Sequence, residues 1–446
     1  MTMMKRGPQN REKKLLSAAG LLGEVRKTFE KVRSVRTNTR GRERTISVAD
    51  SLMSALAMFS LKSPSLLAFD QALKDPVIRH NLKSLYHVKH SPSDTYMREE
   101  LDEVAPENLR KCFLSVFEAA QRGKLFEQYW FLDGYLVLTD GTEIFNSEKV
   151  SCSNCCKKTH RDGRITYYHQ VLAGVIAHPE QRQVIPLCPE IISMQDGTEK
   201  NDCERCATQR FLAALKKEHP RLAATIVSDA LSANTPQINE IKSLGYHFII
   251  NVKPSGNKSL FDFISGLTLP EVHATKDKNN YVFRYINGVP LNDAKDAPSI
   301  NFLECKVTEI DGKRVIEKIF TWVTDHEITK NNVYLIMQGG RARWKIENET
   351  FNTLKNQGYQ FEHNFGHGKK NLMSVFAFLM LLAFLIDQIQ EAACGLFQAA
   401  LQKVFSRRAL WERIRCYFYI CLIDSWEDLF NAIGHGTGAT IDHNSS

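Results

Sequence analysis

The sequence predicts an α/β protein built on a mixed β-sheet flanked by helices. Three features of the chain lead to this fold class. Residues 1–130 show apolar side chains at spacings of three and four, the pattern of amphipathic helices. Residues 131–253 change to the alternating pattern of strands, interrupted by two helical stretches. Residues 254–333 are rich in strand-forming residues, with Asn-Gly and Asp-Gly turns between them.

Residues 1–130 are predicted to form a helical DNA-binding region with a basic N-terminal arm. Helices are expected over 15–32 and 47–61, the second with Ser47 as its N-cap. Residues 1–44 contain 13 Lys and Arg but 4 Asp and Glu, a net charge of +9, whereas the whole chain carries +8. This concentration of charge indicates either a polyanionic partner, such as nucleic acid, or a solvated tail.

A turn at 91–94, with a cap for a short charged helix, follows these helices. Basic residues surround it and either contact phosphate or form an ordinary solvated face. They are Lys83, His87, Lys89, His90 and Arg98.

Residues 131–253 are predicted to form the first part of the sheet domain. Strands are expected at 134–139, 166–178, 182–192, 223–229 and 246–253, with helices at about 202–219 and 235–244. Three consecutive strands followed by helix–strand–helix–strand describe a mixed sheet covered by helices. Residues 254–333 are expected to be an inserted β subdomain. Residues 334–440 are expected to complete the first domain with helices.

The most apolar stretch, 372–386, contains no charged residue. It is shorter than the roughly 20 residues that span a bilayer, so we expect a buried central helix and no membrane partner. No apolar segment of a signal peptide follows the basic N-terminus. The 11 cysteines are therefore expected to be reduced thiols or metal ligands rather than a disulfide framework.

Two aspartates follow predicted strands, and a glutamate lies on a later helix. Asp140 ends the stretch YLVLTD and Asp229 ends TIVSD. Glu347 lies in the stretch 341–364, in the helix predicted to end at Gly358, four residues from Arg343 and therefore on the same face. Because burying an unpaired carboxylate is costly, converging acids favour a hard divalent cation, Mg²⁺ or Mn²⁺. The alternative is that each acid is an ordinary turn or cap residue.

The same helix has an apolar side and a predicted end. Trp344, Phe351 and Leu354 are expected to form an apolar stripe, and Gly358 to terminate the helix. Glu349 is a rival acid, but it lies off the Arg343 face.

Two cysteine pairs have the spacing of a zinc site. Cys152 and Cys155 form one Cys-x-x-Cys pair, and Cys203 and Cys206 form another. The sequence leaves open whether the pairs hold a structural Zn²⁺ or are reduced buried thiols. His160 or His169 is a possible substitute ligand.

Several motifs together resemble the DDE transposases of bacterial insertion sequences, specifically those with a Tyr-Arg-Glu-Lys signature around the glutamate. They are RWKIENETFNTLKN, TDGT, SDAL, HNFGHGKKNL and PEIISMQDGTEKNDCE, which together span most of the chain. The resemblance implies an RNase H-like catalytic fold, interrupted by a β-strand insertion before the glutamate. Two positions depart from the signature: its tyrosine would fall at Gly340, and its lysine at Leu354, one residue before Lys355.

The resemblance also implies the chemistry and its residues. Two Mg²⁺ or Mn²⁺ ions would support nicking at the element's end and attack by the freed 3′-hydroxyl on a second phosphodiester. The implied catalytic residues are Asp140, Asp229, Glu347, Arg343 and Lys355, of which the three acids hold the metal.

The implied partner is double-stranded DNA, as terminal inverted repeats and target, bound by a homodimer in the bacterial cytoplasm at the nucleoid. Candidate DNA contacts are Arg33, Arg36, Arg40, Arg42, Arg44, Arg98, Trp322, Lys369 and Lys370. Trp322 either stacks on an unpaired base or lies in the core of the insertion. Two alternative functions stay open: another RNase H-like nuclease or resolvase, and a catalytically decayed DNA-binding protein.

Overall fold

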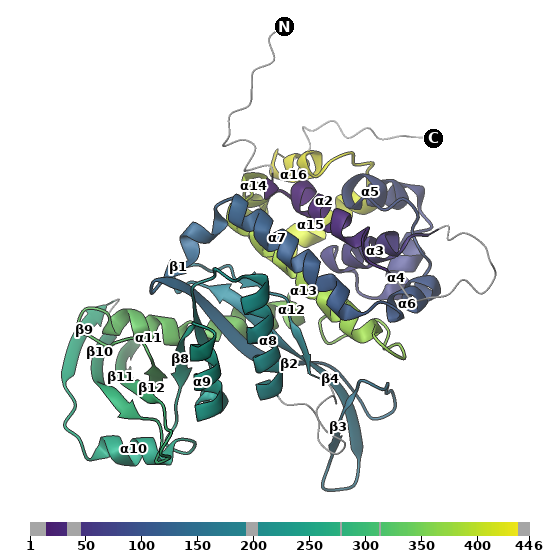
Figure 1. The fold of residues 1–446 in the computed structure, drawn as a ribbon. Coiled ribbons are helices and arrows are strands. Elements are labelled where there is room, and N and C mark those ends of the chain that lie inside the picture. The colour runs from purple at the N-terminus through teal and green to yellow at the C-terminus, as the bar shows by residue number, and fades with distance from the viewer. Residues whose placement is uncertain (1–14, 34–45, 193–203, 277–278, 312–313, 436–446) are drawn as a thin grey trace.

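The computed structural model describes residues 15–33, 46–192, 204–276, 279–311 and 314–435 (Figure 1). The predicted α/β class is confirmed: a mixed sheet of 12 strands is combined with helices. The strands are β1 (Trp130–Phe131), β2 (Gly134–Ser147), β3 (Cys156–Thr159), β4 (Ile165–Ala177), β5 (Ile185–Pro186), β6 (Glu190–Ile192), β7 (Ala224–Ser228), β8 (His247–Asn251), β9 (Glu271–Lys276), β10 (Asn279–Pro290), β11 (Ser299–Asp311) and β12 (Arg314–Thr324).

The centre of the sheet follows the predicted order of strands. β2 pairs antiparallel with β4, and β4 pairs antiparallel with β5 and β6. On the other side, β7 runs parallel to β2 and β8 runs parallel to β7. The single strand expected over 182–192 is divided into β5 and β6. Pro186 ends the first piece and Pro189 precedes the second, because proline has no N–H to donate to the ladder.

β2 is longer than the sequence predicts. It was expected to end at Thr139 but continues to Ser147. Its parallel pairing with β7 stops at Leu138, whereas its antiparallel pairing with β4 continues as far as Ser147 and Tyr167. The outer half of β2 therefore belongs to a ribbon with β4 and β3 that projects beyond the central strands (Figure 1).

The strands predicted within 254–333 form an antiparallel meander, β9 to β12, preceded by α10 (Lys258–Ser265). The meander does not form a separate sheet. β12 pairs with β8, from Trp322 opposite Asn251 to Thr324 opposite Ile249, so the strands continue the central sheet at one end.

Helices cover both faces of the central strands. α8 (Glu204–Glu218) packs on β4, where Phe211 occupies the space that a Cβ at Gly174 would need. α9 (Thr235–Ser243) contacts α8 and β8. α11 (Val333–Arg341) packs on the opposite face, with Gly339 against Ile249.

The first and last helices of the chain pack together on one side of the sheet (Figure 1). Ser47 caps α3 as predicted, its hydroxyl accepting from the Asp50 N–H at 3.0 Å. The N-terminal helices are α2 (Ala18–Phe29), α3 (Val48–Ser60), α4 (Leu66–Ala72), α5 (Pro76–Tyr86), α6 (Asp94–Asp102) and α7 (Arg110–Arg122). The C-terminal helices are α13 (Leu372–Ala393), α14 (Gly395–Val404), α15 (Arg407–Ile420) and α16 (Trp426–His435).

α13 is the buried central helix that the apolar stretch predicts, and it extends beyond the predicted end at 386. It is the one described helix long and apolar enough to cross a membrane, and its most apolar part is wholly buried within the fold. The extension is possible because Asp387 is paired inside the protein, 2.6 Å from Lys62 Nζ. The hydroxyl of Tyr359 also donates to Asp387.

The stretch around the glutamate is not the continuous helix expected from Arg341 to Gly358. α11 ends at Arg341, a π-helical segment, η4 (Ile346–Phe351), carries Glu347, and α12 (Asn352–Asn356) follows. Single π-helical turns are rare and occur frequently at functional sites. Gly358 lies just beyond α12 with φ of +98°, which agrees with its predicted role as a helix terminator.

Candidate active site and candidate metal centre

Asp140 and Asp229 lie at the same end of two neighbouring parallel strands. The register pairs Leu138 of β2 with Val227 of β7, so each aspartate stands two residues beyond this pair. The hydroxyls of Thr139 and Ser228 join the strands one residue earlier, 2.8 Å apart. The carboxylate of Asp229 also caps a short turn. It accepts a hydrogen bond from the backbone N–H of Leu231 at 3.0 Å.

Arg343 joins the first aspartate to the glutamate. Its guanidinium donates to Asp140 Oδ2 at 3.3 Å and to Glu347 Oε1 at 2.7 Å. Helical phase therefore correctly placed Glu347 beside Arg343. The rival Glu349 instead lies near Arg407 and Arg182, at 3.8 and 3.7 Å.

The acids interact electrostatically. Burial raises the pKa of Asp140 to about 6, although the nearby charge of Arg343 opposes the shift. The negative charges of Glu347 and Asp229 raise the Asp140 pKa further. Since both acids act on the same carboxyl group, the structure brings together all three of the acids singled out in the sequence.

A fourth acid, Glu204, lies at this cluster and was missed as a site residue. It is the first residue of α8, and its Oε2 is 2.7 Å from the position that a Cβ at Gly141 would occupy. Burial raises the pKa of Glu204 to about 7, and the charges of Asp140 and Asp229 add to the shift. The available signal was its place at the end of the motif PEIISMQDGTEKNDCE, just where a helix was expected to begin.

Lys355, which the resemblance implies to be a catalytic residue, forms an ion pair with an acid other than the three implied ones. Its Nζ lies 2.7 Å from Glu362 Oε1, just beyond α12. The other departure from the signature has a steric explanation. A Cβ at Gly340 would lie 2.6 Å from Cε2 of Trp322, so a tyrosine at this position is incompatible with the indole.

Two tryptophans, Trp322 and Trp344, lie near Arg343. Trp322, the candidate DNA contact, is the buried one. Trp322 is 1% exposed and packs in the core, which is the second of the two roles considered for it. Trp344 was expected in an apolar stripe but is 62% exposed, because the helix is interrupted between Arg341 and Ile346. Trp344 and Trp322 line a surface hollow of about 440 Å³ together with Arg343.

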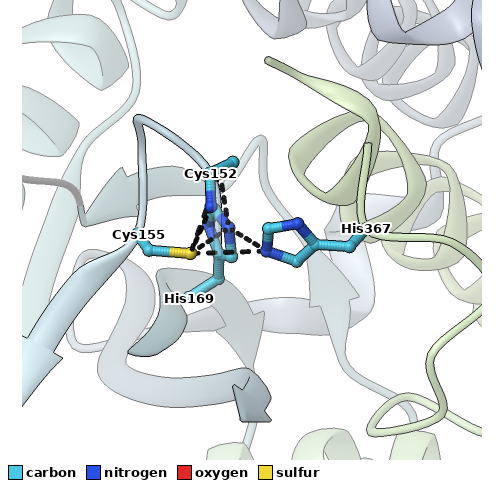
Figure 2. Close-up of side chains that lie close together, drawn as sticks. All are labelled: Cys152, Cys155, His169 and His367. Atoms are coloured by element: carbon cyan, nitrogen blue, oxygen red, sulfur yellow. Dashed lines mark hydrogen bonds between the residues drawn. The ribbon is translucent and has the colours of Figure 1, made fainter. Parts of the chain in front are cut away.

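A second group of side chains has the composition of a metal site. Cys152 and Cys155 lie in the turn after β2, His169 lies on β4, and His367 lies in the loop before α13 (Figure 2). Their ligand atoms all lie within 4.8 Å of one another, and the group is largely buried.

This group differs from the predicted set of four cysteines. His169, considered as a substitute ligand, belongs to it, whereas His367 was not considered. Cys206 lies on α8 and is not a member, and Cys203 lies outside the described residues. His160 is also not a member, because its Nε2 is bonded to Thr166 Oγ1 at 2.7 Å.

A third group, His247, Asp325 and His326, lies where β7 and β8 begin, at the opposite end from Asp229. Its polar atoms already have partners. His247 Nδ1 lies 2.9 Å from Asp325 Oδ2, and His326 Nε2 lies 2.9 Å from Thr225 Oγ1. The first bond lies within the group, and the second joins His326 to β7.

The predicted DNA contacts are spread over the surface. Arg33 is exposed, and Arg36, Arg40, Arg42 and Arg44 lie outside the described residues. Arg98 pairs with Asp94 at 2.6 Å, and Lys370 with Glu103 at 2.7 Å. The backbone N–H of Lys369 donates to Asp102 at 2.9 Å.

Comparison with known proteins adds no assignment. No protein-family model matches the chain, and no curated protein matches its sequence.

Proposed function

We propose that this protein is a DNA transposase of the DDE type. It would cut DNA at the ends of its insertion sequence and join those ends to target DNA by divalent-metal-dependent phosphoryl transfer. The proposal rests on the resemblance of the motifs and on one structural observation: Asp140 and Glu347, far apart in the chain, both bind Arg343, and Asp229 is near enough to act on the Asp140 carboxyl group.

The sheet supports an RNase H-like interpretation of the catalytic domain. Three consecutive antiparallel strands are followed by two strands parallel to the first, with helices on both faces. Asp140 lies just beyond the last residue of β2 that pairs with β7, and Asp229 directly follows β7, so both lie at the carboxyl end of this parallel pair, where α/β sheets commonly bind ligands. The β-strand insertion β9–β12 precedes the glutamate, as the resemblance implies.

The donor atoms at this site suit Mg²⁺ or Mn²⁺. Asp140, Asp229 and Glu347 supply only carboxylate oxygens, which are the ligands of hard divalent cations. Burial is the main cause of the raised pKa of Asp140, and the negative charges of Glu347 and Asp229 add to it, so a bound cation would favour the ionised carboxylate. When bound, two such ions would activate the attacking oxygen and stabilise the leaving oxygen of a phosphodiester.

Arg343 contributes a charge of its own. It offsets the negative charge of Asp140 and Glu347, and a guanidinium in that place can hydrogen-bond a phosphate oxygen at the same acidic site. Glu204 would act as a further carboxylate near Asp140. It would either bind a cation or accept a proton from the reacting water.

A basic surface on the N-terminal helices supports DNA binding outside the catalytic site. A hollow of about 820 Å³ lies between α5 and the turn that precedes α6. Its basic lining residues are Lys74, Arg79, His80, Lys83, Lys89 and His90. DNA contacts there, with those of the N-terminal arm, would make binding weaken steeply with salt. Two DNA ends would be held by a homodimer.

The test is a cleavage and joining assay with Mg²⁺, using as substrate the DNA that flanks this reading frame. Joined products are expected from the wild type and from Glu143→Gln, a control acid on the same strand as Asp140. They should be absent for Asp140→Ala and Asp229→Asn. Cleavage without joining would instead indicate a nuclease or resolvase. Specific binding without either reaction would indicate a decayed DNA-binding protein.

A further inference from the structure

The side chains of Cys152, Cys155, His169 and His367 are arranged around a common point (Figure 2). The two sulfurs are 3.8 Å apart, and the two Nε2 atoms are 3.2 Å apart. His169 Nε2 lies 3.3 Å from each sulfur, and His367 Nε2 lies 3.3 Å from Cys155 Sγ.

These separations are close to the edges of a zinc coordination tetrahedron. With Zn–S of about 2.3 Å and Zn–N of about 2.0–2.1 Å, tetrahedral angles place two sulfurs about 3.8 Å apart and two nitrogens about 3.3 Å apart. A sulfur and a nitrogen should be about 3.5 Å apart. The sulfurs are too far apart for a disulfide, whose S–S bond is about 2.05 Å.

Hydrogen bonds among the four groups cannot account for this arrangement. His169 Nε2 has three neighbours at 3.2–3.3 Å, the two sulfurs and the other imidazole. A ring nitrogen offers either one hydrogen or one lone pair, so it satisfies only one neighbour at a time. A single cation at the centre interacts with all four atoms at once.

The hydrogen bond of one imidazole favours the same conclusion. Nδ1 of His367 lies 3.1 Å from the carbonyl oxygen of Gly368, so its hydrogen is used there and Nε2 can present a lone pair to the centre of the group.

We propose that Cys152, Cys155, His169 and His367 bind one Zn²⁺ in a structural site. All four positions would be occupied by protein ligands, so no position is open for substrate, as in other structural zinc sites. The inference does not depend on the proposed function, since it uses none of the acidic residues.

The ion would join segments that are distant in the chain. His367 lies 198 residues from His169 and 212 from Cys155. The first three ligands belong to the ribbon formed by β2, β3 and β4, and β2 also carries Asp140. His367 belongs to the loop that leads from α12 to α13. Zinc would therefore fix the ribbon of the first acid against the segment that follows the third.

The loop around His367 is shaped to present its ligand. Gly366 and Gly368 have φ of +140° and +71°, values that favour glycine. The carboxylate of Asp102 accepts from four consecutive N–H groups of the chain after Gly368, at 2.9–3.0 Å. Asn154 Nδ2 also donates to the Lys370 carbonyl at 2.7 Å, a second link between the loop and the cysteine turn.

The test is metal analysis of the purified full-length protein by mass spectrometry. We expect about one equivalent of zinc in the wild type, and loss of most of it in Cys152→Ser and His367→Ala. Matched controls are Cys156→Ser, next to a ligand, and His160→Ala, and both should keep the ion. His367→Cys should also retain it, because three cysteines and one histidine form a common zinc site.

Cobalt substitution gives a second measurement that does not require activity. Co²⁺ in this site should show the visible absorption and the sulfur charge-transfer bands of tetrahedral thiolate coordination, and His367→Ala should weaken them. A chelator should lower the melting temperature of the wild type but have little effect on a variant that folds without the ion.

Two outcomes would overturn the proposal. One is less than half an equivalent of zinc with Cys152 and Cys155 freely reactive toward a thiol reagent. The other is loss of zinc in Cys206→Ser with retention in His367→Ala, which would indicate a site built from the two cysteine pairs instead. Neither outcome bears on DNA cleavage, so the zinc proposal and the proposed function can fail separately.

Discussion

The guanidinium of Arg343 lies 3.3 Å from the carboxylate of Asp140, although 203 residues separate them in the chain. This contact connects the helical segment of the glutamate to the central strand of the sheet. If the proposed function holds, the same cation also faces the phosphate that reacts.

Replacing Arg343 by alanine should therefore slow DNA cleavage by about 10²–10³-fold, the usual loss when one charge-stabilising donor is removed from an active site. Single-turnover cleavage of the flanking DNA measures it. Arg182→Ala is the matched control, because Arg182 faces Glu349 rather than the acid cluster. Equal effects of the two substitutions would remove Arg343 from the mechanism.

Asp140→Asn should stabilise the metal-free fold while abolishing activity. The pKa of Asp140 is raised to about 6, so the fold favours its neutral form. The wild type then loses stability as pH rises from about 4, the value in the unfolded chain, through about 6. At pH 8 with a chelator, we expect the variant to be more stable by about 1–2 kcal/mol, after allowance for solvent screening.

Urea unfolding at pH 8 and at pH 4 measures this difference. It should shrink towards pH 4, where the Asp140 carboxyl is protonated in the folded wild type and about half protonated in the unfolded chain. A less stable variant at pH 8 would mean that the ion pair with Arg343 outweighs burial and repulsion.

The pH dependence of cleavage should show the two raised pKa values. Asp140, at about 6, and Glu204, at about 7, must lose their protons before they can bind a cation or accept a proton. The rate should therefore rise with pH across this range at subsaturating Mg²⁺. Glu204→Gln should remove the upper step and shift the rise to lower pH, whereas Glu143→Gln should leave the profile unchanged. An unaltered profile in Glu204→Gln would exclude this acid from the reaction.

Substitution of Trp344 and of Trp322 by alanine should affect different properties of the protein. Trp344→Ala should change the free energy of unfolding by less than about 0.5 kcal/mol, because the side chain is largely exposed. It should weaken binding of single-stranded DNA by about 1–3 kcal/mol if the indole stacks on a base. Trp322→Ala should destabilise the fold by about 3–5 kcal/mol, because that side chain is buried. Thermal unfolding and fluorescence titration separate the two effects.

The parts of the fold governed by local pattern were predictable from the sequence. Alternation placed β4 and β7 correctly, helical phase selected Glu347 over Glu349, and the apolar stretch indicated the buried α13. Each of these depends on residues close together in the chain.

The rest depends on contacts between distant segments. The length of β2 is set by its pairing with β4, and the exposure of Trp344 by the break after α11. His367 becomes a metal-site residue only because its loop meets a turn 212 residues earlier. Glu204 lies against Gly141, next to Asp140, only because α8 packs over β4. The spacing of these residues in the sequence does not predict that contact.

The contact between Gly340 and Trp322 restricts how this chain can change. A larger residue at 340 requires the indole to be replaced first, and losing the indole alone leaves a cavity in the core. The two positions are therefore expected to vary together in related chains. A related chain with tyrosine at 340 should have a smaller side chain at 322, and that pairing would attribute the glycine here to packing rather than to decay of the site.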